Sequence, residues 1–278
     1  MSLYYDLHTH TYHSDGLLAP RELLREAQAS GIRGIALTDH DVTSGLDEAS
    51  RSARDFGVEL IPGVELSVSW SGQTLHILGL RIEPGNPALQ AGLARVQESR
   101  RLRARAMGER LARHGIEGAY EGALRHSRGI IVGRTHFARY LVEQGHAKDL
   151  RHAFTRYLRK GAHGYVATQW PGLDEAVTWI VAAGGLAVIA HPARYHLTAG
   201  ALRRLIDEFK AAGGLGIEVV SGSHSPEDVE RFALLAQEYA LLASAGSDYH
   251  GPGETRTAVG RLAALPSGCV PVWSAWTA

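Results

Sequence analysis

The sequence has little of what marks a secreted, membrane-bound or thiolate-ligated protein. Its single cysteine, Cys269, excludes a disulfide framework and a thiolate zinc cluster. No apolar run approaches the roughly 18 residues of a membrane-spanning helix, and residues 1–30 lack the pattern of a signal peptide. The 29 basic and 29 acidic residues leave no net charge. We therefore expect a soluble, cytoplasmic protein that does not bind membranes, and nothing in the composition indicates an obligate protein partner.

Glycine and histidine, by contrast, are abundant, with 32 and 15 residues. A chain that is 45% hydrophobic and 21% charged can bury a sizeable core, which excludes a disordered chain. Histidine is the commonest metal ligand in proteins and titrates near neutral pH. The positions of the histidines therefore decide how the sequence is interpreted.

Seven short apolar runs have the length of β-strands and alternate with amphipathic helical patterns. The expected strands are 3–7, 34–38, 58–64, 75–80, 186–190, 216–220 and 241–245. The helical patterns include 20–29, 174–183, 202–212 and 226–235. Strand–helix alternation predicts an α/β fold with a mainly parallel sheet. Seven repeats favour a closed or nearly closed barrel, which would gather functional residues at the carboxyl ends of its strands.

The range 93–160 interrupts this alternation. It is predicted to be helical throughout, with helices at 93–114 and 135–144, and it contains 14 Arg and 2 Lys but 6 acidic residues. Its net charge is therefore +10, and the rest of the chain carries −10. We interpret 93–160 as a small, all-helical, Arg-rich lid domain inserted into a barrel formed by 1–92 and 161–278.

Imidazole and carboxylate side chains follow or lie within most of the predicted strands. The nine candidates are His8, His10, Asp15, His40, Glu65, His76, His191, Asp248 and His250. His8 and His10 are two residues apart on an extended chain and so point to one side. His76 taken alone would be read as a core residue, but the joint occurrence of these residues at strand ends predicts a metal site. Asp39 and Asp41, which flank His40, are expected to cap a helix, and Glu218 is a weaker candidate.

Imidazole and carboxylate ligands without thiolate suit zinc, manganese or iron. Nine ligands are more than two ions need. Three divalent ions would leave a positive charge after Asp15, Glu65, Asp248 and a bridging hydroxide are counted. An anionic substrate such as a phosphate ester fits that excess, and metal ions would lower the pKa of bound water and clamp the phosphoryl oxygens.

These motifs resemble the polymerase and histidinol phosphatase (PHP) family of metal-dependent phosphoesterases. The resemblance covers nearly the whole chain and is carried by segments 6–16 (DLHTHTYHSDG), 37–41 (LTDHD), 62–65 (PGVE), 75–79 (LHILG), 190–192 (AHP) and 246–250 (GSDYH). It is greatest for the bacterial branch that holds nucleoside 3′,5′-bisphosphate phosphatases and 5′-3′ exoribonucleases. The resemblance implies a distorted (β/α)7 barrel with a helical insertion and a trinuclear metal site, with Mn2+ favoured over Zn2+ or Fe2+.

Carried over position by position, the resemblance assigns every candidate ligand to an ion. His8, His10, Glu65 and Asp248 would hold the first ion. Glu65 would bridge to a second ion that His76 and His191 complete, and the third ion would be held by Asp15, His40 and His250. His191 or His250 would be the catalytic proton donor to the leaving oxygen.

The insertion would supply contacts to the substrate. Arg103 and the segment 133–139 (GRTHFAR) resemble lid segments that face the metals in this branch. Arg134, Thr135 and His136 are therefore expected to bind phosphate, with Thr135 capping a helix whose amides favour an anion. Arg194, which follows His191, would meet phosphate or pair with an acid.

The function expected first is removal of the 3′-phosphate from nucleoside 3′,5′-bisphosphates, because a basic lid over a cationic site suits a substrate with two phosphates. A 5′-3′ exoribonuclease acting on short 5′-phosphorylated RNA would use the same site and is the alternative. Histidinol phosphate, with one phosphate and a cationic tail, fits the basic lid poorly. A third hypothesis is a non-catalytic nucleic-acid-binding module with structural metals.

Overall fold

A nearly closed, barrel-shaped sheet forms the body of the molecule, of which the computed structural model describes residues 5–128 and 131–276. The strands stand in sheet order as in the chain: β1 (Tyr5–Asp6), β2 (Gly34–Leu37), β3 (Glu59–Trp70), β4 (Gln73–Leu80), β5 (Leu186–Ile189), β6 (Gly216–Ser221) and β7 (Leu242–Gly246). The backbone N–H of Leu7 donates to Ala245 O at 2.9 Å, which joins β1 to β7. The nearly closed barrel is thus confirmed. Residues 3 and 4 of the first predicted strand lie outside the described residues.

The barrel departs from a regular (β/α)7 arrangement at β3 and β4. β1 to β3 and β5 to β7 run parallel, whereas β4 is antiparallel to both of its neighbours. β3 and β4 form a hairpin whose two turn residues, Ser71 and Gly72, have φ of 47° and 75°, as a two-residue type I′ turn requires. No helix separates these two strands, and β3 continues to Trp70 rather than ending near residue 64. This hairpin distorts the barrel.

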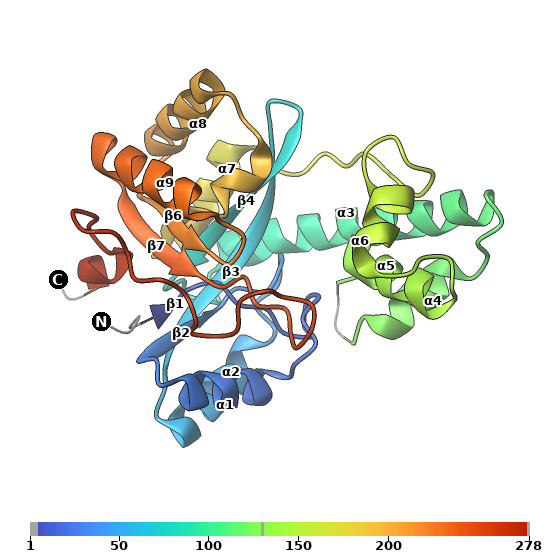
Figure 1. Ribbon diagram of the computed structural model, residues 1–278, viewed down its shortest axis with the longest axis horizontal. Coiled ribbons are helices and arrows are strands. Elements are labelled where there is room, and N and C mark those ends of the chain that lie inside the picture. Colours follow the sequence, from blue (N-terminus) through green and yellow to red (C-terminus); the bar gives the residue numbers. More distant parts are fainter. Residues whose placement is uncertain (1–4, 129–130, 277–278) are drawn as a thin grey trace.

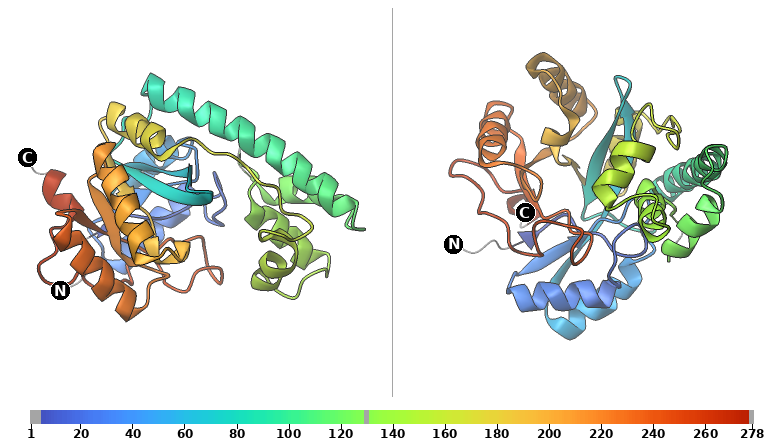
Figure 2. Two further views of the ribbon diagram at one scale, coloured as in Figure 1. Left: turned by 90° about the horizontal axis from the view of Figure 1, so that it is seen from above. Right: turned by 45° about the vertical axis from the view of Figure 1, so that its right-hand side comes forward.

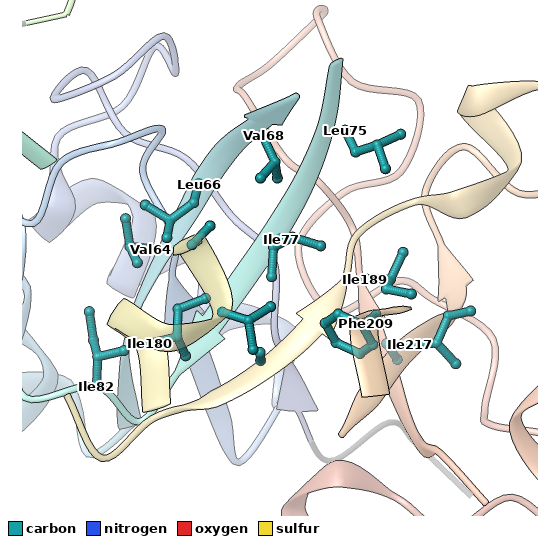
Figure 3. Close-up of a cluster of buried hydrophobic side chains, with 14 of the residues drawn as sticks. Val64, Leu66, Val68, Leu75, Ile77, Ile82, Ile180, Ile189, Phe209 and Ile217 are labelled. Atoms are coloured by element: carbon teal, nitrogen blue, oxygen red, sulfur yellow. The ribbon is translucent and has the colours of Figure 1, made fainter. Parts of the chain in front are cut away.

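Helices cover the outside of the sheet (Figure 1). They are α1 (Pro20–Ser30), α2 (Leu46–Phe56), α7 (Leu173–Ala182), α8 (Ala199–Ala211) and α9 (Pro226–Glu238), with 3-10 turns at Pro192–Tyr195 and Val272–Trp276. Val64, Leu66 and Val68 of β3 pack in the core formed with these helices (Figure 3). The intervening Glu65 therefore points to the inside of the barrel, because side chains alternate along a strand.

The C-terminal segment packs on the barrel. Val272 is fully buried among residues such as Ile61 and Leu78, in a core separate from the one beneath the helices. The rings of Trp273 and Trp276 each lie 5.3 Å from the ring of Tyr5. The tail therefore covers the amino-terminal end of the barrel, where β1 begins. Residues 277 and 278 lie outside the described residues.

The insertion lies beside the barrel and is all-helical where it is described (Figure 1). It contains α3 (Pro87–Ala112), α4 (Ala119–His126), α5 (Arg134–Glu143) and α6 (Leu150–Ala153), which continues as a π-helical turn at Phe154–Leu158. Ala104 and Met107 of α3 belong to a core that the insertion forms on its own. None of the described helices is both long and apolar enough to cross a bilayer.

The helix α3 connects the two parts (Figure 2). It begins before residue 93 because Pro87 occupies its first turn and the Asn86 side chain accepts hydrogen bonds from two amides of that turn. Its first half packs on the barrel, where Leu89 and Leu93 join the main core. One continuous helix thus crosses the predicted domain boundary, and the division at residues 93 and 160 stays a prediction.

Candidate metal centre

The nine candidate ligands come together at the end of the barrel to which the parallel strands point. Glu65 and His76 lie on β3 and β4, and the others lie in segments that follow β1, β2, β5 and β7. Ligand atoms within 4.8 Å of one another form three groups. These groups are His8, His10, Glu65 and Asp248; His10, Asp15, His40 and His250; and His40, Glu65 and His76.

The three groups overlap the three predicted ligand sets without being identical to them. The first group has the same members as the first predicted set, and the second contains the third predicted set plus His10. The group around Glu65 and His76 contains His40 instead of His191. His191 lies beside this group, with Nε2 at 3.0 Å from Glu65 Oε1. The assignment of each residue to one ion stays a prediction.

Several ligand atoms in this cluster are buried and lack a hydrogen-bond partner. These atoms include His8 Nε2, His40 Nδ1, Asp15 Oδ1 and Glu65 Oε2. Glu65 Oε2 lies 3.2 Å from His8 Nε2 and 2.9 Å from His40 Nδ1. A buried polar atom without a hydrogen-bond partner destabilises the fold. Ligand atoms that face one another without such partners are therefore suited to coordinate divalent ions between them. The donor set of imidazole and carboxylate agrees with that interpretation.

The charges of the cluster compensate each other in the metal-free chain. Burial raises the pKa of Glu65, but the surrounding imidazoles outweigh burial and hold that pKa well below its usual range. Burial lowers the pKa of His10, yet hydrogen bonds to Asp248 and Glu65 raise it to about 10. Metal ligands must be deprotonated, so metal binding at His10 has to displace a proton from that ring.

The two predicted proton donors have opposite pKa shifts. Burial lowers the pKa of His191 to about 4, in spite of its hydrogen bond with Glu65. Burial and the charge of His10 lower the pKa of His250, but the carboxylates of Asp15 and Asp248 raise it above its ordinary value. At neutral pH His191 is therefore neutral in this arrangement, whereas a larger fraction of His250 is protonated.

Three acidic residues support the ligands, and sequence patterns did not assign them this role. Glu218 Oε1 lies 2.9 Å from His8 Nδ1, which directs the other nitrogen of that ring into the cluster. Asp39 accepts hydrogen bonds from the backbone N–H and hydroxyl of Thr11. The expected helix cap is wrong for both Asp39 and Asp41, because α2 begins after Gly45 without a side-chain cap.

Asp41 instead anchors the loop that carries His40. Its backbone has φ of 52°, and its carboxylate accepts the backbone N–H of Ser67 at 2.8 Å. The other oxygen of Asp41 lies 2.6 Å from Arg100 on α3. Asp41 is fully buried and Arg100 is 8% exposed, so this ion pair joins α3 to the metal-site loop away from water.

Arginine side chains gather on the side of the insertion that faces the barrel. The guanidinium carbons of Arg100 and Arg103 lie 5.2 and 5.5 Å from the ring centroid of the buried Trp170. Arg103 Nε is buried without a hydrogen-bond partner. Burial, together with the charges of Arg134 and Arg100, lowers the pKa of Arg103 to about 9. Partly buried guanidinium groups that repel each other would be stabilised by a bound anion.

The other predicted substrate contacts have protein partners. The Thr135 hydroxyl donates to Asp15 Oδ2 at 2.8 Å instead of capping α5, so the predicted cap is wrong. Helix α5 begins after Gly133, whose N–H donates to Nδ1 of the buried His136. Arg194 pairs with Asp248, with Nη2 2.5 Å from Oδ2. Contact of these three residues with a substrate stays a prediction.

The chain is similar over nearly its full length to proteins of known activity. It is 51% identical over 269 residues to the 3′,5′-nucleoside bisphosphate phosphatase of Chromobacterium violaceum, a match that covers 96% of this chain and 94% of that protein. It is 43% identical over 276 residues to the 5′-3′ exoribonuclease Rnm of Salmonella typhimurium, covering 98% of this chain and 93% of that one.

A solved structure agrees with the fold. The structure of an amidohydrolase from Chromobacterium violaceum, with bound sulfate and no metal, superposes with a TM-score of 0.95 at 49% identity. The match covers 99% of this chain and 96% of that one. The family model of the PHP domain matches residues 6–169. Together with the clustered imidazoles and carboxylates, these similarities show that the chain belongs to the PHP domain family.

Proposed function

We propose that the chain is a metal-dependent phosphatase that removes the 3′-phosphate from nucleoside 3′,5′-bisphosphates and leaves a nucleoside 5′-phosphate. The observation that carries the proposal is the combination of two sites: a buried cluster of open metal ligands and a neighbouring group of arginines, of which Arg100 is buried and Arg103 and Arg134 are half-buried. The metal ligands suit the 3′-phosphate that is removed, and the arginines suit the 5′-phosphate that remains on the product. The similarity to the bisphosphate phosphatase of Chromobacterium violaceum supports the same conclusion.

The metal centre is proposed to hold three divalent ions, with Mn2+ as the first choice and Zn2+ or Fe2+ as alternatives. The nine clustered residues would hold them in the predicted sets. When bound, the ions would activate water and polarise the phosphoryl oxygens. The protein's own contribution is to fix the ligands, as Glu218 does for His8, and to exclude bulk water from a largely buried site.

Substrate orientation is assigned to the insertion. Thr135 contacts the candidate ligand Asp15. The Arg134 guanidinium lies 5.9 Å from the Phe154 ring centroid and is close enough to Asp15 for that carboxylate to oppose the lowering of its pKa by burial. Arg103 and Arg134 would donate charge-assisted hydrogen bonds to the second phosphate, with His136 and Arg194 as further contacts. His191 and His250 are both proposed as candidates for the proton donor to the leaving oxygen.

A 5′-3′ exoribonuclease activity on short 5′-phosphorylated RNA is the second candidate. The similarity to the exoribonuclease of Salmonella typhimurium favours it, and both reactions would use one metal centre. A non-catalytic nucleic-acid-binding module is less compatible with the site, because a structural metal needs one closed set of ligands and the barrel brings nine residues together.

Product analysis separates these functions. Mn2+-loaded protein would be incubated with adenosine 3′,5′-bisphosphate, and the two possible monophosphates would be separated by chromatography. Adenosine 5′-phosphate and inorganic phosphate are the expected products. Absence of turnover, together with release of mononucleotides from 5′-phosphorylated RNA, would identify the exonuclease instead.

A variant of a candidate ligand tests whether the metal centre carries the activity. Asp15→Asn should abolish turnover of the bisphosphate while leaving the salt-sensitive binding of polyanions largely intact, because the arginines remain. Full turnover by this variant would contradict the metal assignment. Loss of binding as well as turnover would instead indicate that the variant is misfolded, which a comparison of circular dichroism spectra would reveal.

A further inference from the structure

One face of helix α5 contacts the loops that carry two of the candidate metal ligands. Thr135 and Arg139 are four residues apart and so lie on the same side of this helix. Thr135 donates to Asp15 Oδ2 at 2.8 Å, and Arg139 Nη2 donates to the backbone oxygen of Asp15 at 2.6 Å. The opposite face, with Phe137 and Leu141, is buried in the insertion's own core. Helix α5 thus connects that core directly to a metal-ligand loop.

Arg139 also binds the loop that follows β7. Its Nε and Nη2 donate to the two carboxylate oxygens of Glu254 at 2.8 and 2.6 Å. The side chains are only 10% and 14% exposed. A bidentate pair of this kind fixes geometry as well as charge. The next residue, Thr255, accepts a hydrogen bond from the backbone N–H of His250 at 2.8 Å, so Glu254 and Thr255 together set the position of His250.

Asp15 and His250 face each other across one site. Asp15 Oδ1 lies 3.2 Å from His250 Nε2, and Asp15 Oδ1 is buried without a hydrogen-bond partner. Both residues lie in irregular segments, whereas Glu65 and His76 lie on strands. The ligands on strands are positioned by the sheet, whereas the two loops are joined by a backbone hydrogen bond from Leu17 N–H to His250 O at 2.7 Å. Arg139 adds a side-chain contact from the insertion to both loops.

We propose that Arg139 is a positioning residue for one metal ion, the one held by Asp15, His40 and His250, and that α5 thereby makes occupancy of this ion depend on the docking of the insertion. The proposal rests on the metal centre of the proposed function. Loss of a group that orients metal ligands costs about 10- to 100-fold in metal affinity. The loss of metal affinity should be confined to this one ion, because the other candidate sites take ligands from β3 and β4.

The test compares metal content and does not use activity. Arg139→Gln and Glu254→Gln would each be equilibrated by dialysis against a series of Mn2+ concentrations, and bound manganese would be measured by elemental analysis. Each variant is expected to bind one ion per chain about 10- to 100-fold more weakly than the wild type, with the remaining ions unchanged. Arg101→Gln is the matched control, because Arg101 pairs with Glu98 on the exposed side of α3.

Combined variants identify the affected ion. Asp15→Asn should lose the same ion, so adding Arg139→Gln to it should cause no further loss from the remaining sites. The Arg139→Gln/Glu254→Gln pair should bind no more weakly than Arg139→Gln alone, because both residues act through one contact. If Arg139→Gln fails to fold, Glu254→Gln still tests the proposal. Urea unfolding of the metal-free variants would reveal such a failure.

Two results would overturn the proposal. The first is unchanged manganese binding by both variants, and the second is an equal weakening of every ion, which indicates a general structural role. A wild-type chain that binds manganese as described but does not hydrolyse the bisphosphate would refute the proposed function and leave the role of Arg139 standing. A wild-type chain that binds no manganese would refute both.

Discussion

Replacing Arg100 by glutamine removes one side of the buried ion pair that joins α3 to the loop of His40. The carboxylate of Asp41 then keeps one hydrogen bond, from the backbone of Ser67, and loses the guanidinium at 2.6 Å. Breaking a buried pair from one side typically costs about 3–5 kcal/mol, because a charge remains buried without compensation. Glutamine and arginine have similar helix propensities, so the loss reports the buried contacts of Arg100, which are the ion pair, a hydrogen bond to Ser67 Oγ and the contact with Trp170, and not the helix.

The neighbouring residue provides a matched control. Arg101 lies on the same helix and is also paired with an acid, Glu98, but both side chains are about half exposed. Exposed pairs contribute little to stability because water and salt screen them. Arg101→Gln should therefore leave the unfolding curve in urea unchanged. With a slope near 3 kcal/mol per molar urea, Arg100→Gln should lower the midpoint by about 1 to 1.7 M.

A double variant tests the cause of the effect. Asp41→Asn combined with Arg100→Gln removes both charges together and should restore part of the lost stability, since an uncharged pair is cheaper to bury than a single charge. Urea unfolding of the metal-free protein, followed by far-UV circular dichroism, measures these three variants and the single variant Asp41→Asn against the wild type. Equal midpoints for Arg100→Gln and Arg101→Gln, or a double variant that is as unstable as the sum of its parts, would refute the reasoning.

Three further measurements test other parts of the site. Binding of Mn2+ near pH 7, followed by calorimetric titration, should release protons, because carboxylates outweigh burial and raise the pKa values of His8 and His10. The affinity for Mn2+ should therefore rise with pH. A binding heat that is the same in buffers of different ionisation enthalpy would contradict this expectation. Gly246→Ala would place a Cβ 2.2 Å from His8 Cβ and should cost about 1–3 kcal/mol as well as metal affinity, whereas Gly200→Ala, with open space around it, should not. Arg134→Ala should raise KM for the bisphosphate about 10- to 100-fold and leave KM for an aryl phosphate unchanged; an equal rise for both would remove Arg134 from recognition of the second phosphate.

The barrel could be predicted from the sequence because each strand is an apolar run with polar residues or glycine at its ends. The hairpin at Ser71–Gly72 was missed for a physical reason. Beyond residue 64 the chain alternates polar side chains such as Ser67 with apolar ones such as Leu66 and Val68, so it no longer forms a continuous apolar run. That alternation is itself a strand signal with a period of two. It marks a strand with one face in the core and one face inside the barrel.

The cluster of candidate ligands could be predicted because the carboxyl ends of barrel strands meet in space even when they are far apart in the chain. The supporting contacts follow no such rule. Arg100 and Asp41 are 59 residues apart, and Arg139 and Glu254 are 115 apart. No spacing in the sequence relates these partners, since each contact depends on how the insertion docks against the barrel. Sequence patterns therefore indicated a metal site and left out the contacts that hold it.

The positive charge of the insertion serves two purposes, and the structure separates them. Arg100 and Arg139 each pair with a largely buried acid of the barrel and so hold the insertion against the metal-site end, whereas the pair of Arg95 with Glu175 is exposed. Arg103 differs, because its Nε is buried without a hydrogen-bond partner and neighbouring arginines lower its pKa. A guanidinium held in that position lowers the folding stability of the protein without ligand and would strengthen the binding of an anion. In the proposed function, Arg103 and Arg134 are the groups that this docking would offer to a second phosphate.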